Sequence, residues 1–543
     1  MNGHAGSNHS RNFEENMVLL EEKSLSDVES DAGRADIESR FLSQAAKWSS
    51  QARSHVLGGL MRGSTAWRAS LLRAGFFLIP SFVQARISRD HRRLSSSRAA
   101  AAAPERLGPT AYLDGMRGLA AFFVFFCHYF YTCFHIAGGW GDDGDRFWFL
   151  RLPFVRLVYS GPPMVCVFFV ISGYALSLKP LRLARARSFA TFASTMSSFV
   201  FRRGLRLFLP TAISTLMIVL LLRLGLYEWT RDFANDPTYL RNVREPHYGR
   251  LPTLHAQLED WFWAVINFVH VWDWDPFGGS TGLDVHLWTI PVEFRCSMML
   301  FLTLIGTARL RTAIRFLVLA MIMTFTYRSA RWEMLLFLSG MALAEIDIIR
   351  DAHATSGSSS SPTTAITTTG EANRMLWLAL SAVGLYLMSQ PDIGSETTPG
   401  FVTLCNLIPG WWPPHDRYRY WQSVGAVLFV GAVARGVPRR DWQQVFSHPA
   451  AQYLGRISYA VYLVHGPVMH TLGYAFERAV WTHITGVQSE FAYVAGFMIA
   501  SVFVISSVIS AADLFWRAVD APVVRFSRWL EARCSMPPSA ASD

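Results

Sequence analysis

The chain has 543 residues, of which 51% are hydrophobic and 17% are charged, whereas an ordinary soluble domain has about 25% charged residues. That much apolar surface cannot be hidden in one or two soluble cores, so the composition excludes a disordered protein, a coiled coil and a typical soluble enzyme. The formal net charge of +10 comes from arginines clustered between apolar runs. This pattern is typical of cytoplasmic membrane loops and argues against nucleic-acid binding.

Residues 1–105 form a polar N-terminal extension that is predicted to be largely disordered. The first residues contain no apolar segment, so no cleavable signal peptide is predicted. Within the extension, residues 52–93 mix Arg with Leu, Phe and Trp, as in LMRGSTAWRASLLRAGFF. Such a stretch is either a basic amphipathic segment on an anionic membrane surface or a disordered basic linker.

The remainder, residues 108–530, reads as an all-α polytopic membrane bundle. Residues 351–370 (DAHATSGSSSSPTTAITTTG) interrupt it as a Ser/Thr-rich, low-complexity loop. Ten apolar segments predict about ten transmembrane helices, at 119–136, 161–178, 207–226, 287–308, 313–330, 332–348, 375–389, 421–434, 457–474 and 491–515.

The arginines predict the orientation of this multi-pass bundle. Ten spans with both termini in the cytoplasm place every Arg cluster on the cytoplasmic side, including Arg309–Arg315 and Arg517–Arg533. The segment 259–272 (EDWFWAVINFVHVW) would reverse this assignment if it crossed the bilayer, so it is predicted to be re-entrant or interfacial.

The first candidate for chemistry is the pair Arg117 and His128 in YLDGMRGLAAFFVFFCHYF. Eleven residues are close to three helical turns, so both side chains point to one face, about 16 Å apart along the axis. The guanidinium at the cytoplasmic rim suits a phosphate group, and the deeper imidazole suits a general base that deprotonates an alcohol. The alternative is a snorkelling Arg with a His that bonds a neighbouring helix.

The second candidate is LWTIPVEFRCSMM, which places Glu293 and Arg295 inside a span. Glu293 is predicted to orient and stabilise an imidazolium, as the acid of a catalytic triad does. Arg295 is predicted to contact the substrate, and either residue would balance developing charge. A structural ion pair of Glu293 with Arg295 or Arg117 is the alternative, although residues two apart on a helix do not face each other.

Three further motifs carry polar side chains in or beside spans. Ser172 and Tyr174 in FFVISGYALS, and His465 in GRISYAVYLVHGP, are predicted to contact substrate or, alternatively, to serve helix packing. Arg202, Arg203 and Arg206 in FRRGLRLFLP form a basic stripe at a cytoplasmic helix start, which either holds phosphates or anchors the helix. A count of depth places His128, Ser172 and His465 near one plane, with Glu293 slightly deeper. No metal site is predicted, and the six cysteines read as small buried hydrophobes.

Taken together, DGMRGLAAFFVFFCHY, FFVISGY, RRGLRLFLP, LWTIPVEF and ISYAVYLVH resemble the acyltransferase 3 family of integral membrane O-acyltransferases, over roughly residues 108–515. The resemblance implies transfer of an acyl group, often acetyl, from cytoplasmic acyl-CoA to a hydroxyl of a carbohydrate, lipid or natural product. It implies acyl-CoA as a co-substrate and no permanently bound cofactor. The composition and layout of the chain predict a eukaryotic, fungal member.

The resemblance also implies roles for individual residues. Arg117 and His128 match the family's Arg–ten residues–His motif, in which the His is catalytic. Arg203 and Arg206 match its cytoplasmic Arg-rich motif, which is associated with the acyl donor. Glu293 and His465 match its Trp-containing and late Tyr–Leu–x–His motifs.

Two other function classes fit the same polar residues. A secondary transporter or proton-coupled channel would use His128, Glu293 and His465 as a path, but the motifs of the first half do not recur in the second as an inverted repeat would. A catalytically dead scaffold is the other alternative, and the intact Arg117, His128 and Glu293 argue against it.

Overall fold

The computed structural model describes residues 75–84, 86–87, 107–142, 147–272, 280–357, 366–436 and 440–536. They belong to two compact units, Met1–Leu113 and Asp114–Asp543. In the first unit, short helical pieces cover 75–78, 81–84 and 86–87. The predicted disorder of the N-terminal extension, and most of its basic stretch, lie outside the described residues.

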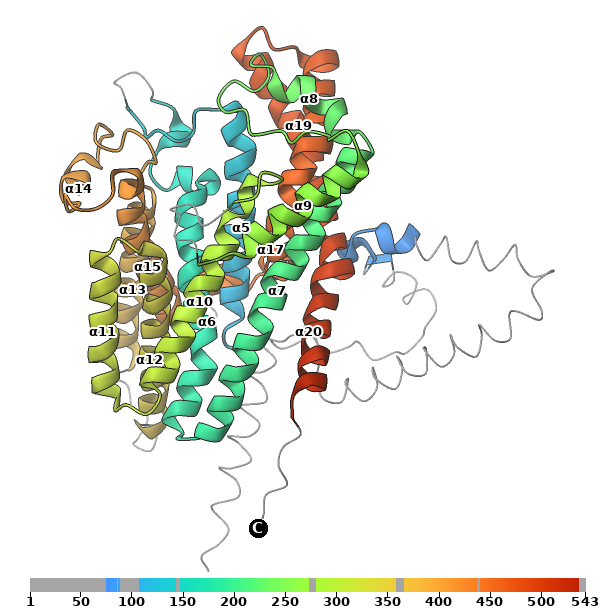
Figure 1. Ribbon diagram of the computed structural model, residues 1–543. Coiled ribbons are helices and arrows are strands. Elements are labelled where there is room, and N and C mark those ends of the chain that lie inside the picture. The colour runs from blue at the N-terminus through green and yellow to red at the C-terminus, as the bar shows by residue number, and fades with distance from the viewer. Residues whose placement is uncertain are drawn as a thin grey trace, which may run out of the picture. The chain divides into compact units, whose positions relative to one another are not determined.

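Sixteen α-helices, α5 to α20, and no strand occur in the described part of the chain, which confirms the all-α class (Figure 1). Ten of them coincide with the ten predicted apolar segments: α5 (Ala111–Cys133), α6 (Gly161–Arg185), α7 (Phe189–Arg223), α10 (Thr289–Thr307), α11 (Thr312–Arg328), α12 (Trp332–Gly357), α13 (Ile366–Met388), α15 (Arg417–Arg435), α17 (Pro449–Val468) and α19 (Glu490–Phe515).

Shorter helices connect or extend these ten. The α-helices among them are α8 (Leu226–Asn235), α9 (Leu254–Val269), α14 (Val402–Asn406), α16 (Asp441–Phe446), α18 (Tyr474–Val480) and α20 (Ala521–Cys534). The 3₁₀ turns are η1 (Phe149–Arg151), η2 (Val155–Tyr159), η3 (Val285–Trp288) and η4 (Pro414–Asp416), and the π turns are η5 (Met469–Gly473), η6 (Trp481–Thr485) and η7 (Trp516–Asp520).

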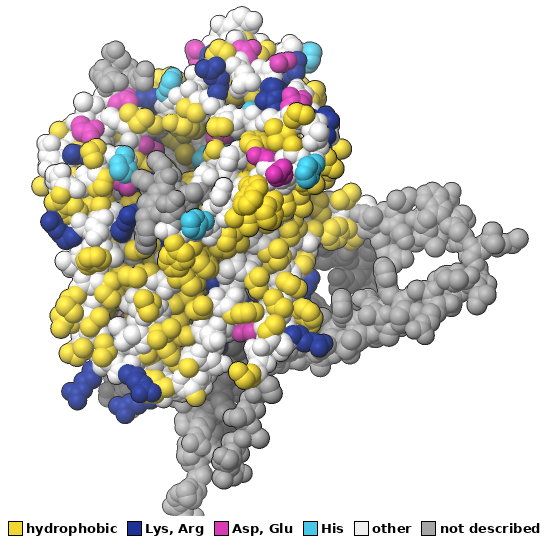
Figure 2. All heavy atoms as spheres, viewed as in Figure 1, with side chains coloured by type: hydrophobic (Ala, Val, Ile, Leu, Met, Phe, Trp, Pro, Cys, Tyr) yellow, Lys and Arg dark blue, Asp and Glu magenta, His cyan; other side chains and the backbone are white. Residues whose placement is uncertain are grey.

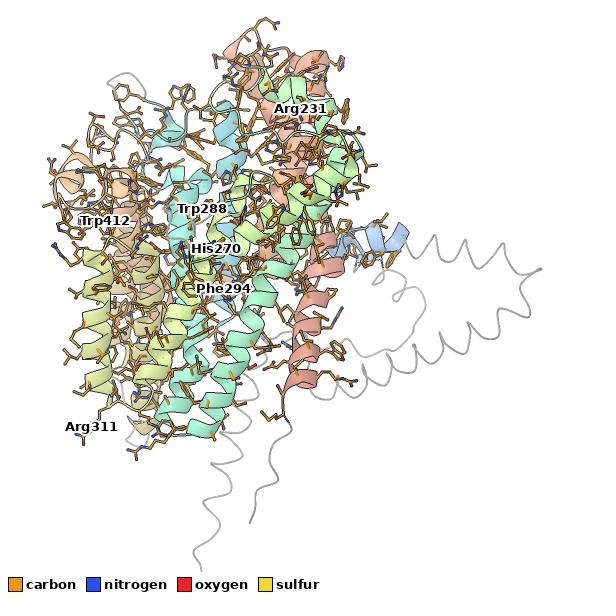
Figure 3. All side chains as sticks on the ribbon, in the orientation of Figure 1. Arg231, His270, Trp288, Phe294, Arg311 and Trp412 are labelled. Atoms are coloured by element: carbon orange, nitrogen blue, oxygen red, sulfur yellow. The ribbon has the colours of Figure 1, made fainter. Side chains whose placement is uncertain are left out.

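Four of the described helices are long and apolar enough to cross a membrane: Gly161–Arg185, Phe189–Arg223, Val285–Thr307 and the continuous helix Glu490–Cys534. Hydrophobic side chains cover the middle of the visible face of the bundle, and Lys and Arg side chains gather along its lower rim (Figure 2). Arg231 and Arg311 mark the two opposite ends (Figure 3). An apolar middle between charged ends is the arrangement of a multi-pass membrane protein.

Two predicted boundaries are corrected. Helix α7 begins at Phe189 and has 35 residues, so Arg202, Arg203 and Arg206 lie several turns inside it and not at a helix start. The residues before the arginines include Ser and Thr, which hide a helix from a search for apolar runs but do not prevent one. The Ser/Thr-rich loop is also shorter than predicted, because α12 runs to Gly357 and α13 starts at Ile366, and residues 358–365 lie outside the described residues.

The helices pack closely where glycines face backbone. A Cβ atom on Gly173 of α6 would overlap the carbonyl oxygen of Phe337 in α12, and one on Gly340 would overlap that of Val170. A Cβ atom on Gly118 of α5 would likewise overlap the backbone nitrogen of Gly455 in α17. The last contact brings together the two helices that carry His128 and His465.

Helix α9 (Leu254–Val269) covers most of the ambiguous segment 259–272. It packs along α7, and the indole of Trp261 donates a hydrogen bond of 3.0 Å to Oγ1 of Thr215. Its opposite stripe exposes Phe262, Trp263 and Ile266. An exposed aromatic stripe on one side of a 16-residue helix is what an interfacial position requires.

Candidate active site

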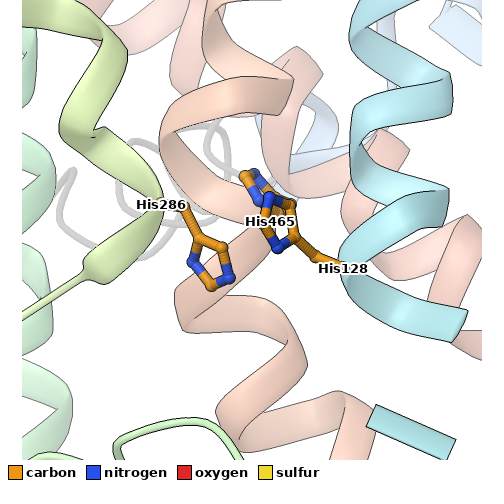
Figure 4. A group of neighbouring side chains, drawn as sticks. All are labelled: His128, His286 and His465. Atoms are coloured by element: carbon orange, nitrogen blue, oxygen red, sulfur yellow. The ribbon is translucent and has the colours of Figure 1, made fainter. Parts of the chain in front are cut away.

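Three imidazoles from three segments meet in the bundle: His128 on α5, His286 in η3 and His465 on α17 (Figure 4). The ring centroid of His128 lies 4.2 Å from that of His286 and 5.5 Å from that of His465, and the latter two are 4.7 Å apart. The sequence placed His128 and His465 near one plane but did not single out His286.

The carboxylate beside His128 is Glu245, from the loop between α8 and α9. Its Oε1 atom lies 3.6 Å from Nδ1 of His128 and 3.1 Å from Nε2 of His286, and its Oε2 atom lies 3.3 Å from Nε2 of His470. A second carboxylate, Asp284, holds the other side of His286, with Oδ1 2.6 Å from Nδ1. One buried acid therefore touches three imidazoles, and a second acid fixes one of them.

Local backbone structure explains where His286 points. Asp284 caps η3, because its side chain accepts a hydrogen bond of 3.0 Å from the backbone N–H of His286. The hydroxyl of Tyr462 on α17 donates a hydrogen bond to the carbonyl of His286 and accepts one of 2.7 Å from Oγ1 of Thr289, the residue after η3. Asp284 thus caps the start of the 3₁₀ turn, and Tyr462 ties the turn to α17.

Both carboxylates are held ionised by their surroundings. Burial alone would raise the pKa of Glu245, but the charge of His286 and hydrogen bonds from His128, His286 and His470 hold that pKa well below its ordinary value. Burial likewise opposes ionisation of Asp284, and the charge and hydrogen bonds of His286 lower its pKa.

Exposure and hydrogen bonding separate the three imidazoles. His128 keeps 27% of its side chain exposed, against 1% for His286, so a substrate can reach it. His465 is completely buried, its Nδ1 lies 3.1 Å from the carbonyl oxygen of Val461, and its Nε2 has no hydrogen-bond partner. With the proton on Nδ1, Nε2 of His465 presents a free lone pair.

The donor atoms of His128, His286 and His465 lie within 4.8 Å of one another, a spacing that a divalent metal ion can bridge. The sequence predicted no metal ligands. The two nitrogens of His286 each face a carboxylate oxygen, however, so a metal would have to displace a proton from one of those contacts.

Glu293 has a different partner from the predicted one. Its Oε1 atom accepts a hydrogen bond of 2.7 Å from Nη2 of Arg203, whose Nε donates to Oγ of Ser297 at 2.9 Å. Ser172 also donates to Glu293, at 3.4 Å. The expectation that Glu293 orients an imidazolium is therefore corrected, because Glu245 occupies that position beside His128, and the expected structural pairs with Arg295 or Arg117 give way to Arg203.

Basic side chains gather below the imidazoles. Arg206 lies within electrostatic range of Arg117, Arg203 and Arg528 of α20, and of two carboxylates, Asp114 and Asp520. Arg117 forms an ion pair of 3.1 Å with Asp114, yet its Nε has no hydrogen-bond partner. Arg202 points elsewhere and pairs with Glu531 at 3.0 Å. A cluster with more guanidinium groups than carboxylates is suited to phosphate groups.

Two predicted substrate contacts lie in other surroundings. The hydroxyl of Tyr174 donates a hydrogen bond of 3.1 Å to Asp347, which also pairs with Arg435 at 3.4 Å. Arg295 is buried and within electrostatic range of Glu333. These contacts favour helix packing for both residues.

The sequence analysis missed Glu245, Asp284, His286 and His470. A usable signal existed, because Glu245–Pro–His247 and Asp284–Val–His286 are two acid–x–His patterns in loops that flank the membrane. The second lies directly before the LWTIPVEF motif.

Comparisons with known proteins identify the family of the chain. Residues 110–510 match the family model of an acyltransferase domain, acyltransferase 3. The chain is 33% identical over 452 residues to O-acetyltransferase PaAT-1 of Phomopsis amygdali, which covers 79% of this chain and 85% of that protein. It is 27% identical to acyltransferase clz18 of Cochliobolus lunatus (76% and 94% covered) and 27% identical to acyltransferase R4 of a Phoma species (77% and 95% covered). No solved structure matches the chain.

Proposed function

Because this chain belongs to the acyltransferase 3 family and is a membrane acyltransferase, as its motifs predicted, we propose that it is an acyl-CoA-dependent O-acetyltransferase with His128 as its general base. The acceptor is a hydroxyl of a small natural product, a carbohydrate or a lipid. The observation that carries the proposal is the reachable imidazole of His128, whose Nδ1 lies 3.6 Å from a buried carboxylate and whose ring lies beside a second imidazole.

The proposed topology has ten membrane spans, formed by the ten long helices, with both termini in the cytoplasm. Arg311 then lies at the cytoplasmic end and Arg231 at the opposite end (Figure 3). Helix α9 lies at the interface. Helix α7 is longer than the roughly 20 residues that a span needs, so its first turns extend into the cytoplasm.

The basic cluster of Arg117, Arg203 and Arg206 is the proposed donor site, with Arg528 as an additional member. Glu293 and Ser297 orient the guanidinium of Arg203 toward this site. Arg117 and His128 are separated by about 16 Å along α5, which an extended pantetheine arm spans while the nucleotide stays at the arginines. His465 is completely buried beside His128, so we assign it to packing around the base and not to direct contact with the acceptor hydroxyl.

In the proposed reaction the acceptor oxygen attacks the thioester carbon. Nε2 of His128 takes the hydroxyl proton as the new C–O bond forms, the C–S bond breaks, and the CoA thiolate receives the proton from the imidazolium. The products are the acetyl ester and free CoA, and no net proton is released.

The test uses purified protein, [¹⁴C]acetyl-CoA and the small-molecule extract of the cells that produce the protein. We expect labelled ester and an equal amount of free thiol. His128→Ala should lose about 10²–10⁴-fold in rate, whereas His135→Ala, an exposed imidazole just beyond the end of α5, should not change it. An unchanged rate in folded His128→Ala protein would remove the assigned base.

A further inference from the structure

Two buried carboxylates, Glu245 and Asp284, lie against the imidazoles of the site. Glu245 contacts His128, His286 and His470, and Asp284 contacts His286. A buried carboxylate without a cationic partner is costly, so the protons on these rings decide whether the group is stable.

The hydrogen bonds determine where the protons are. Each nitrogen of His286 faces a carboxylate oxygen, and a carboxylate can only accept, so both nitrogens carry a proton. This ring is therefore an imidazolium. It has no N–H left for a substrate, and its charge acts through the two acids.

The same reasoning applies to His470. Nε2 of His247 donates to the carbonyl of Tyr227 at 2.7 Å, which leaves a lone pair on its Nδ1. That lone pair faces Nδ1 of His470 at 2.9 Å, so Nδ1 of His470 carries a proton, and its Nε2 carries another toward Glu245. Two imidazolium ions then balance two carboxylates, and the buried network is neutral before His128 takes part.

We propose that Asp284, His286 and Glu245 form a positioning relay for His128, in which Glu245 accepts the Nδ1–H of the catalytic imidazole and His286 keeps Glu245 ionised and aimed. The proposal rests on the proposed function, with His128 as the base. Fixing Nδ1–H directs the free Nε2 lone pair at the acceptor hydroxyl. When Nε2 takes the proton, the new imidazolium lies against a carboxylate that is already in place.

The distance of 3.6 Å between Glu245 and His128 is longer than a hydrogen bond. Catalytic contacts are often long before substrate binds and shorten in the complex. His286 and His470 hold Glu245 from two sides, so closure needs a movement of the reachable His128 ring and not of the buried acid.

The packing on α17 depends on the relay geometry. A Cβ atom on Gly466, next to His465, would lie 2.8 Å from Oδ2 of Asp284 and 2.9 Å from Nδ1 of His286. Only a residue without a side chain lets the Asp284–His286 pair approach α17 this closely.

Glu245→Gln tests the relay because it keeps the shape of the side chain and removes its charge. We expect kcat to fall at least about 100-fold with KM for acetyl-CoA unchanged, and Glu245→Asp to recover part of the loss. The acid side of the pH–kcat profile should also move to lower pH, because the imidazolium loses its stabilising charge. If Glu245 had a purely structural role, the pH–kcat profile would not move, and Glu245→Asp would not have a higher kcat than Glu245→Gln.

Glu228→Gln is the matched control, since this outer carboxylate pairs with Arg231 away from the site. It should leave kcat and the pH profile unchanged. If His128→Ala is inactive while folded Glu245→Gln keeps full kcat, the relay is wrong and the proposed function stands. If His128→Ala keeps full activity, His128 is not the base, and the proposed function is contradicted before the relay is tested.

Metal analysis distinguishes the proposed positioning relay from a metal centre at the same three rings. We expect the purified protein to hold no stoichiometric zinc and to keep its activity and melting temperature after treatment with EDTA. One zinc ion per chain whose removal abolishes activity would overturn the relay, because the metal would then occupy a nitrogen that the relay needs protonated.

Discussion

A Cβ atom added to Gly466 would lie 2.8 Å from Oδ2 of Asp284. Real Cβ atoms do not approach this closely, so the Asp284–His286 pair must shift in Gly466→Ala. We expect kcat to fall by about 10-fold or more, because small displacements of catalytic groups are costly. Gly306→Ala in α10 is the control, since a Cβ atom there meets nothing within 4 Å. Equal kcat values for the two variants would show that the contact does not position the site.

The contact between α6 and α12 predicts a loss of stability without a loss of chemistry. Gly173→Ala would push a methyl group into the backbone of Phe337, and overpacking of this kind typically costs about 1–3 kcal/mol. We expect a lower melting temperature in detergent and an unchanged rate per folded molecule at low temperature. A melting temperature equal to that of Gly306→Ala would contradict the close packing.

The basic cluster predicts the response of donor binding to charge. Arg206→Gln should raise KM for acetyl-CoA by about 10–100-fold with little change in kcat. The substitution removes a charged contact with phosphate, and this contact is equally strong in the substrate complex and in the transition state. Added salt should weaken this difference between wild type and variant. Arg244→Gln, at an exposed site in the outer loop, should keep the wild-type KM. A fall in kcat alone in Arg206→Gln would argue against donor binding at this site.

His247 predicts how stability depends on pH. Burial lowers the pKa of His247 from 6.5 to about 4, and the charge of His470 contributes in the same direction. The unfolded chain therefore binds a proton more tightly, so the contribution of this group is complete above about pH 6.5 and is lost as the pH falls toward about 4. Melting temperatures should decline across that window, and His247→Gln should decline less. Parallel curves for the two proteins would exclude this residue as the cause.

The helices could be predicted from the sequence because a membrane span is a local property. A helix occurs at each of the ten apolar segments. Such helices can be predicted because hydropathy over about 20 neighbouring residues is sufficient to identify them. The start of α7 was missed because its first turns contain Ser and Thr, and those turns are not apolar. His128 and His465 were predicted to lie at similar depth on two helices, and their ring centroids are 5.5 Å apart.

The acids could not be assigned in the same way. Glu245 and Asp284 lie outside the helices in connections of irregular structure, and no periodicity states on which neighbouring helix such a residue will pack. Glu293 was placed correctly on a helix but given the wrong neighbour, because depth in the membrane says nothing about the rotation of one helix against another. Its actual partner, Arg203, is 90 positions away.

Helix α5 carries Arg117 near one end and His128 toward the other, where loops from the opposite end of the bundle supply Glu245 and Asp284. In the proposed topology, the two proposed reactants would therefore approach from separate compartments and meet inside the protein. Such sidedness would let a cell keep its activated thioester in one aqueous phase while it modifies molecules that are dissolved in the other phase or in the lipid.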